Sequence, residues 1–458
     1  MSSVLSWEIL AYIFRLSQLS NTTIDDGNLR LGDYDVPSME SGIPPEIQVS
    51  HVSQRWRQIA LGTGALWTTI FVQPGASHEA VSAYLERSSG SLLDVIIVCD
   101  GPPYDDDERS RAHQKTFDLA LLHISRWRRC WFDSPRDDID SPFLPCLTPV
   151  HAPALEYLSI GVESSNRLRP PQRGGLSIES TPGMFKGGCP RLRFVYLRGV
   201  AVWFFCPPMS TVIALSIEHT RQIRISLPEF RALLKSSPSL THFSISGDIL
   251  GDQSWPQSES ITMPALRSLA ISSFRASNYS SILLAIDAPR LRKIVLKDAQ
   301  EHDLDPFLHS SHAFKFPLLR SLVFCDSHFT VLKYRMFFAS FPSVSELTLY
   351  GDINLPSILR IISDTAHFAP HSVDSLWPRL KVLNVDLSLA TEEGLLPKDG
   401  LERRLKTGHG PKKMRLGIPV DEEEDYALVM ACSDPDWLEE HISVEIMEGA
   451  VLWRQCCC

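Results

Sequence analysis

The chain has 458 residues, of which 44% are hydrophobic and 21% charged, an ordinary balance for folded domains. This length allows two or three domains, or one elongated repeat structure. A formal net charge of −10 argues against nucleic acid or an anionic membrane as a partner, because both attract basic proteins.

Two further features bear on localisation. The longest apolar stretch, 201–217, is interrupted by two prolines, and no basic leader precedes the first apolar residues, so we expect neither a membrane span nor export. No two of the ten cysteines are separated in the sequence by the spacing typical of metal ligands. We therefore expect reduced thiols in the cytoplasm or nucleus.

The first predicted elements are two helices, over about 5–14 and 49–60. The apolar residues of the second are three or four positions apart and should form one stripe of that helix: Val49, Val52, Trp56 and Ile59. The glycines of segment 62–64 predict its end. Between the two helices, residues 17–48 are rich in Gly, Pro, Asp and Asn, which predicts a flexible insertion.

The next elements are a helix over 78–87, a buried strand over 92–98, an acidic loop over 101–108 and a helix over 111–132. The strand is predicted from a short, branched run that is apolar on both faces. The last helix is predicted from apolar residues at helical spacing, which would place Phe117, Ile124 and Trp127 inward.

From about residue 150 a pattern repeats nine times, and in eight copies it begins with proline. Apolar residues follow at the second, fifth and seventh positions, as in Pro153 with Leu155, Leu158 and Ile160. Successive copies lie 20 to 37 residues apart. Each copy predicts a short strand that faces a shared core, with the remainder returning as helix or loop.

The residues between those apolar positions should project from the open face of the predicted strands. They are small, mixed and weakly charged, which suits a protein partner, although a solvated face without a ligand is the alternative. The candidate target-binding residues are Phe194, Tyr196, His242, Lys293, Glu346 and Thr348.

The C-terminal part is expected to cap the repeats. It predicts a strand at 416–418, a helix that starts at the acidic run 421–425 and continues to Cys432, and a strand over 442–446. We assign no role to the terminal residues Cys456, Cys457 and Cys458.

The sequence has no phosphate loop, nucleophile elbow or dinucleotide fingerprint, the common motifs for catalysis or cofactor binding. The densest group of possible metal ligands has a spacing typical of no established site, and we interpret it as a polar loop: His302, Asp303, Asp305, His309 and His312. We therefore expect no catalytic residue, no cofactor and no metal.

The N-terminal region resembles a known family. Residues 49–67, VSHVSQRWRQIALGTGALW, resemble the second half of an F-box as found in mushroom-forming fungi, where V-S-x-V-C-x-x-W-R-x-I-A precedes a Leu-Trp pair. Residues 5–14, LSWEILAYIF, resemble its opening L-P-x-E-I-L-x-x-I-F. Ser6 replaces the usual proline and Ser53 the usual cysteine. The repeats are similar to the Leu-x-x-Leu-x-Leu core of leucine-rich repeats.

This resemblance implies an α/β fold, with an N-terminal helical F-box-like domain followed by an irregular leucine-rich-repeat solenoid. The expected parts are an F-box-like domain over 1–75, a helix–strand–helix region over 76–150, repeats over 151–418, and a cap and tail over 419–458. The resemblance further implies contacts with the adaptor subunit of a cullin-RING ubiquitin ligase through Leu5, Ile9, Leu10, Ile13, Phe14, Val52 and Trp56.

The implied function is that of a substrate receptor of an SCF-type ligase, which binds an unknown target protein through its repeats and has no active site of its own. One alternative is a repeat-containing binding scaffold whose N-terminal helices serve only as a cap, with Leu5 and Ile9 buried internally. A second is an enzyme whose site is assembled from scattered residues, in which case a pocket with perturbed pKa values is expected.

Overall fold

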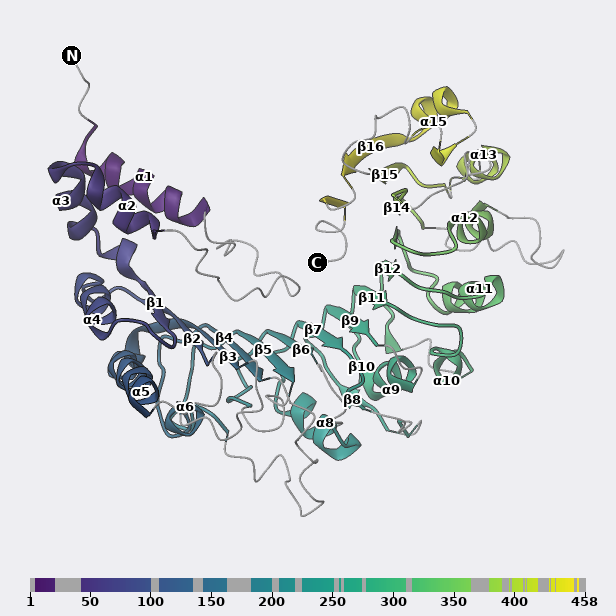
Figure 1. Ribbon diagram of the computed structural model, residues 1–458. Coiled ribbons are helices and arrows are strands. Elements are labelled where there is room, and N and C mark those ends of the chain that lie inside the picture. Colours follow the sequence, from purple (N-terminus) through teal and green to yellow (C-terminus); the bar gives the residue numbers. More distant parts are fainter. Residues whose placement is uncertain are drawn as a thin grey trace. The chain divides into compact units, whose positions relative to one another are not determined.

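The computed structural model forms two compact units, Met1–Ile223 and Arg224–Cys458 (Figure 1). The structure describes residues 5–20, 43–99, 107–134, 143–162, 183–199, 206–218, 225–250, 255–256, 259–273, 277–309, 315–363, 379–388, 395, 398–406, 408, 410–418, 428, 430–432, 434–448 and 451–452.

The first unit is a mixed α/β structure in which the described strands run parallel. Each is hydrogen-bonded to the next in chain order, from β1 to β6. Its elements are α1 (Trp7–Ser20), α2 (Pro45–Val52), α3 (Gln54–Gly62), η1 (Gly64–Trp67), β1 (Thr69–Val72), α4 (His78–Arg87), β2 (Leu93–Val98), α5 (Asp107–Leu121), η2 (Ile124–Arg126), β3 (Trp127–Ser134), α6 (Phe143–Leu147), β4 (Tyr157–Val162), β5 (Phe194–Gly199) and β6 (Ala214–Glu218).

The second unit repeats this arrangement with parallel strands in the order β7-β9-β11-β12-β13-β14-β15-β16, while β8 and β10 form a separate pair. Its elements are α8 (Leu227–Lys235), β7 (His242–Ser246), β8 (Ile261–Thr262), β9 (Ser268–Ser272), α9 (Ser277–Ala285), β10 (Ile286–Asp287), β11 (Lys293–Lys297), α10 (Asp305–Leu308), β12 (Ser321–Cys325), α11 (Val331–Ser340), β13 (Glu346–Tyr350), α12 (Leu355–Ser363), β14 (Val382–Asp386), α13 (Lys398–Lys406), β15 (Lys413–Ile418), α15 (Pro435–His441) and β16 (Ser443–Glu448).

All nine strands predicted from the repeated pattern are present, as β4, β5, β6, β7, β9, β11, β12, β13 and β14. Every apolar position of the pattern is at most 2% exposed. The register aligns equivalent positions of neighbouring copies, for example Leu322 with Leu347 and Leu347 with Leu383. Helices α4, α5 and α6 of the first unit and α8 to α13 of the second lie along one side of their strands (Figure 1), and we call the face that these helices leave uncovered the open face.

The helix predicted over 111–132 is wrong in its second half, because α5 ends at Leu121 and residues 127–134 form β3. Helical spacing of Ile124 and Trp127 was misleading. Strand β3 completes hydrogen bonding between β2 and β4, and this tertiary pairing overrides the local pattern. Since β3 pairs with β4, the predicted boundary at residue 150 lies between two hydrogen-bonded strands.

The single helix predicted over 49–60 is also wrong, because two helices meet at Ser53. Ser53 is extended (φ −158°, ψ 164°), and its hydroxyl accepts a hydrogen bond from the Trp56 amide at 3.2 Å. This N-cap begins α3 and shifts the helical phase. As a result Val52 is 61% exposed, whereas Ile59 is fully buried.

Three other predictions involve residues outside the described part of the chain. The predicted insertion 17–48 is shortened, since α1 continues to Ser20 and α2 begins at Pro45, and its residues 21–42 are not described. The acidic run 421–425 and the cysteines 456–458 are likewise not described.

The predicted terminal strand is present as β16 and pairs with β15, so it extends the sheet. None of the helices described is both long and apolar enough to cross a membrane.

Candidate protein-binding surfaces

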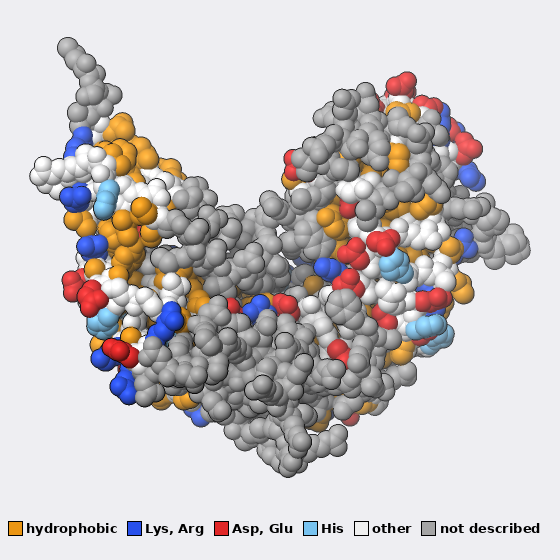
Figure 2. Space-filling view, in the orientation of Figure 1, with side chains coloured by type: hydrophobic (Ala, Val, Ile, Leu, Met, Phe, Trp, Pro, Cys, Tyr) orange, Lys and Arg blue, Asp and Glu red, His pale blue; other side chains and the backbone are white. Residues whose placement is uncertain are grey.

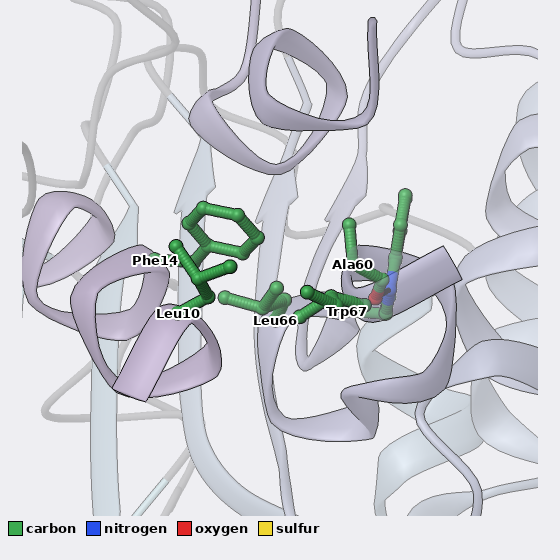
Figure 3. Close-up of a cluster of buried hydrophobic side chains, with 6 residues drawn as sticks. Leu10, Phe14, Ala60, Leu66 and Trp67 are labelled. Atoms are coloured by element: carbon green, nitrogen blue, oxygen red, sulfur yellow. Dashed lines mark hydrogen bonds between the residues drawn. The ribbon is translucent and has the colours of Figure 1, made fainter. Parts of the chain in front are cut away.

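The N-terminal helices have a core of their own, shown in Figure 3. It contains Leu10, Phe14, Ile59, Ala60, Leu66 and Trp67, each at most 5% exposed. The indole N–H of Trp67 donates to the Ala60 carbonyl at 2.8 Å, and the ring of Phe14 lies 4.9 Å from that of Trp56. The inward side of α1 is therefore occupied by internal packing.

The opposite side of α1 is apolar as well. We call its exposed apolar residues, together with Leu5 two positions before the helix, the outer stripe. Leu5, Ile9, Tyr12 and Leu16 are three or four positions apart, Ile13 lies beside Tyr12, and all five are 42% to 61% exposed. A helix on a monomer surface normally presents polar side chains to water. The outer stripe is therefore an unusual feature that calls for a partner.

Exposed apolar side chains are concentrated in this part of the molecule. Nine of the fourteen large hydrophobic side chains that are exposed in the described residues precede residue 62: Leu5, Trp7, Ile9, Tyr12, Ile13, Leu16, Ile43, Val52 and Leu61. Figure 2 shows hydrophobic side chains gathered over these helices. A contiguous apolar surface of this kind is typical of a protein–protein interface.

The structure separates the predicted adaptor contacts into two groups. Leu5, Ile9, Ile13 and Val52 are exposed. Leu10 and Phe14, by contrast, are buried in the helical core, and Trp56 is partly buried against it. The physical reason for this correction is that α1 is apolar on both faces, so only packing shows which face turns inward. Tyr12 and Leu16, which the sequence analysis did not single out, complete the outer stripe.

In the F-box pattern that the N-terminal sequence resembles, proline and cysteine stand at the positions of Ser6 and Ser53. Serine can replace them because it caps a helix at both positions. Besides Ser53, the hydroxyl of Ser6 accepts from the Ile9 amide at 3.4 Å, and its carbonyl accepts from the Leu10 amide at 3.2 Å. Both serines therefore satisfy backbone donors at the start of a helix.

A buried carboxylate ties α1 and α2 to α4. Glu46 in α2 is 6% exposed and accepts hydrogen bonds from Tyr84 in α4 at 2.7 Å and from Gln18 in α1 at 3.3 Å. Burial raises the pKa of Glu46 above its ordinary value. Gln18 also donates to the Leu66 carbonyl at 3.0 Å. The outer stripe is thus held in a defined position against α4.

On the open face of the first unit, the candidate residues Phe194 and Tyr196 lie in a packed aromatic surface. Phe194 packs against the buried cluster of Ile96, Trp131 and Tyr157. Tyr196 is 7% exposed, and its hydroxyl donates to Glu218 on the neighbouring strand. These contacts hold both side chains rigidly in place.

One ion pair crosses this surface because a glycine leaves room for it. Arg198 on β5 reaches Asp133 on β3 at 2.7 Å, and Gly161 on β4 lies between them. A Cβ atom at Gly161 would lie 2.7 Å from the Asp133 carboxylate, which is closer than van der Waals contact allows. The glycine is therefore required for this bridge.

In the second unit the candidate residues differ in exposure. His242 is exposed and Lys293 half-buried. Thr348 is fully buried, and its hydroxyl accepts a hydrogen bond from the Asn384 amide at 2.9 Å. Asn384 also donates to Glu346 at 3.2 Å, so Thr348 and Glu346 belong to a polar network rather than a solvated row.

The group of possible metal ligands has structural contacts instead. Asp303 is 2% exposed and accepts from the Gln300 amide at 2.6 Å, and Asp305 pairs with Lys333. His312 is outside the described residues. Within the described ranges, no three His, Cys, Asp or Glu side chains are arranged to hold a metal ion.

Comparisons with known proteins do not assign the chain. No protein-family model matches it, and no curated protein is a detectable relative. The surfaces described above are therefore the basis on which its function is inferred.

Proposed function

We propose that this protein is a substrate receptor of an SCF-type cullin-RING ubiquitin ligase. The outer stripe of α1 binds the adaptor subunit, and the open faces of the strands bind a target protein. The observation that carries the proposal is the exposure of Leu5, just before α1, and of Ile9, in its first turn, at 44% and 48%, while the inward side of the helix is packed. If the helices served only as a cap, both side chains should be buried internally.

The outer stripe is large enough to contribute substantially to binding. Complete burial of one large aliphatic side chain stabilises by about 1.5–3 kcal/mol, and roughly half of each stripe residue is still exposed. Five such residues provide roughly 5 kcal/mol, a large share of the roughly 8 kcal/mol of a micromolar complex. Val52 and other exposed residues of the same helices add to this surface.

The connection through Glu46 supports a receptor mechanism. A receptor acts by holding its target near an enzyme supplied by partners, and this effect depends on limited freedom between the two binding surfaces. The hydrogen bonds of Glu46 and the edge-to-face contact of Trp67 with Tyr84, at 4.9 Å, fix α1 and α2 to α4. No catalytic group is needed in this mechanism.

The proposal is tested by titrating the full chain with the purified adaptor subunit. Wild-type protein is expected to bind, and Ile9→Asp should weaken binding at least about tenfold, since one buried aliphatic contact is lost and a carboxylate is buried instead. Ile9 lies in the first turn of α1, where a negative charge is favoured by the helix dipole, so the variant should remain folded.

Leu332→Asp is the matched control. Leu332 is 65% exposed on α11 of the second unit, so the same substitution there should leave adaptor binding unchanged. Equal binding by both variants, or no binding by the wild type at micromolar concentration, would refute the proposal and favour a binding scaffold without ligase association.

A further inference from the structure

The open face of the second unit has an apolar patch that is covered by the chain's own C-terminal segment. The patch consists of Val295 on β11 and of Val323 and Cys325 on β12, with Ala270, Tyr350 and Met447 packed around it. Leu452 belongs to the same cluster and is fully buried.

The patch lies on the open face of the sheet. Val323 and Cys325 alternate with Leu322 and Phe324, which face the helix-covered core, so they point to the open side. They are nevertheless only 1% and 0% exposed. Leu452, which comes from outside the strands, belongs to the same buried cluster and so contributes to covering both side chains.

The described contact with the patch comes from one side chain after β16. Strand β16 ends at Glu448, and only Val451 and Leu452 are described after it. Of the residues described after β16, Leu452 alone belongs to the cluster, so a single aliphatic side chain makes the described contact. Such a contact can be exchanged for an equivalent one from another protein.

We propose that this patch is the anchor site for a short segment of a target protein that presents a leucine or a similar branched side chain, and that Leu452 occupies the site until the target displaces it. This inference rests on the proposed function, because it specifies how the repeats recognise a target. Lys293 and Lys297 flank Val295 on the same face, so an acidic residue near the leucine would be favourable. The chain's own Glu448 is such a residue.

An attached competitor weakens binding of a separate segment by a predictable mechanism. The apparent dissociation constant equals the intrinsic one divided by the fraction of protein with a free site. A tethered segment has an effective concentration of the order of millimolar, so with an intrinsic dissociation constant of about 0.1 mM or lower it leaves the site free for about a tenth of the time or less. Removing Leu452 from the site is therefore expected to tighten binding of a separate segment at least about tenfold.

The test uses the full chain and a fluorescent peptide with the sequence of residues 446–455, IMEGAVLWRQ. Leu452→Asp protein is expected to bind this peptide at least about tenfold more tightly than wild type, since the attached segment can no longer compete. A peptide in which the same leucine is replaced by aspartate should not bind. Equal binding by both proteins, or no binding by Leu452→Asp, would overturn the proposal.

A second measurement keeps the proposal testable if the aspartate variant does not fold. Cys325 is fully buried within the same cluster as Leu452, so Leu452→Ala should increase its alkylation by iodoacetamide in native protein, as measured by mass spectrometry. Cys130, buried in the first unit, is the internal control and should not change. An unchanged rate at Cys325 would show that Leu452 does not cover the patch. Neither assay contains the adaptor, so their outcomes are independent of adaptor binding.

Discussion

Replacing Phe14 with alanine is expected to destabilise the N-terminal helices strongly, whereas the same change at its neighbour Ile13 should not. Phe14 is 2% exposed in the helical core, and an aromatic side chain buries about 150–250 Å². At about 25 cal/mol per Å² this corresponds to about 4–6 kcal/mol, and the contact with Trp56 adds about 1 kcal/mol. Since the denatured chain is itself partly compact, a loss of about 4 kcal/mol is expected.

Ile13 is 42% exposed, so Ile13→Ala removes little buried surface in the free protein, and alanine is the better helix former. Its expected effect is within about 0.5 kcal/mol. Hydrogen exchange of the amides in α1 and α3 under native conditions measures the local opening free energy of each variant. Similar values for the two variants would refute the assignment of Phe14 to the core and Ile13 to the outer stripe.

Three further predictions concern individual contacts. Because burial raises the pKa of Glu46 above 4.5, this carboxyl group keeps its proton to higher pH in the folded protein than in the unfolded chain. The free energy of unfolding in urea should therefore fall as pH rises from 4.5 through the raised pKa. Glu46→Gln should abolish this pH dependence. Gly161→Val should lower unfolding free energy by about 1–3 kcal/mol in the same assay, as its side chain displaces Asp133; an unchanged value would contradict this steric account. Ser53→Ala should lower the free energy of unfolding by about 1 kcal/mol, because the N-cap hydrogen bond is lost. Ser53→Asp, whose carboxylate can also cap α3, should keep most of that stability, as measured by thermal unfolding.

The strands were the most predictable part of the fold. Apolar residues at fixed spacing, preceded by proline in eight copies, located all nine, since each copy must bury the same positions in a shared core. Strand β3 was missed because the apolar residues of 124–127 also fit a helix, and only its pairing with β2 and β4 distinguishes the two structures.

The candidate adaptor surface was predictable only in part. The apolar residues of α1 were recognised, but periodicity does not show which of two apolar faces is packed, so Leu10 and Phe14 were grouped with Ile9 and Ile13. The patch beneath Leu452 was not predictable, because it depends on a contact between segments more than 100 residues apart in the sequence.

The central claim is that α1 binds the adaptor through its outer stripe, and hydroxyl-radical footprinting of the full chain with and without the adaptor tests it most directly. The account predicts that oxidation of Ile9, Tyr12 and Leu16 falls when the adaptor is bound, while oxidation of Leu332, which is exposed in the other unit, is unchanged. Unchanged oxidation of the outer stripe in a mixture at saturating adaptor, or protection confined to the repeats, would contradict it.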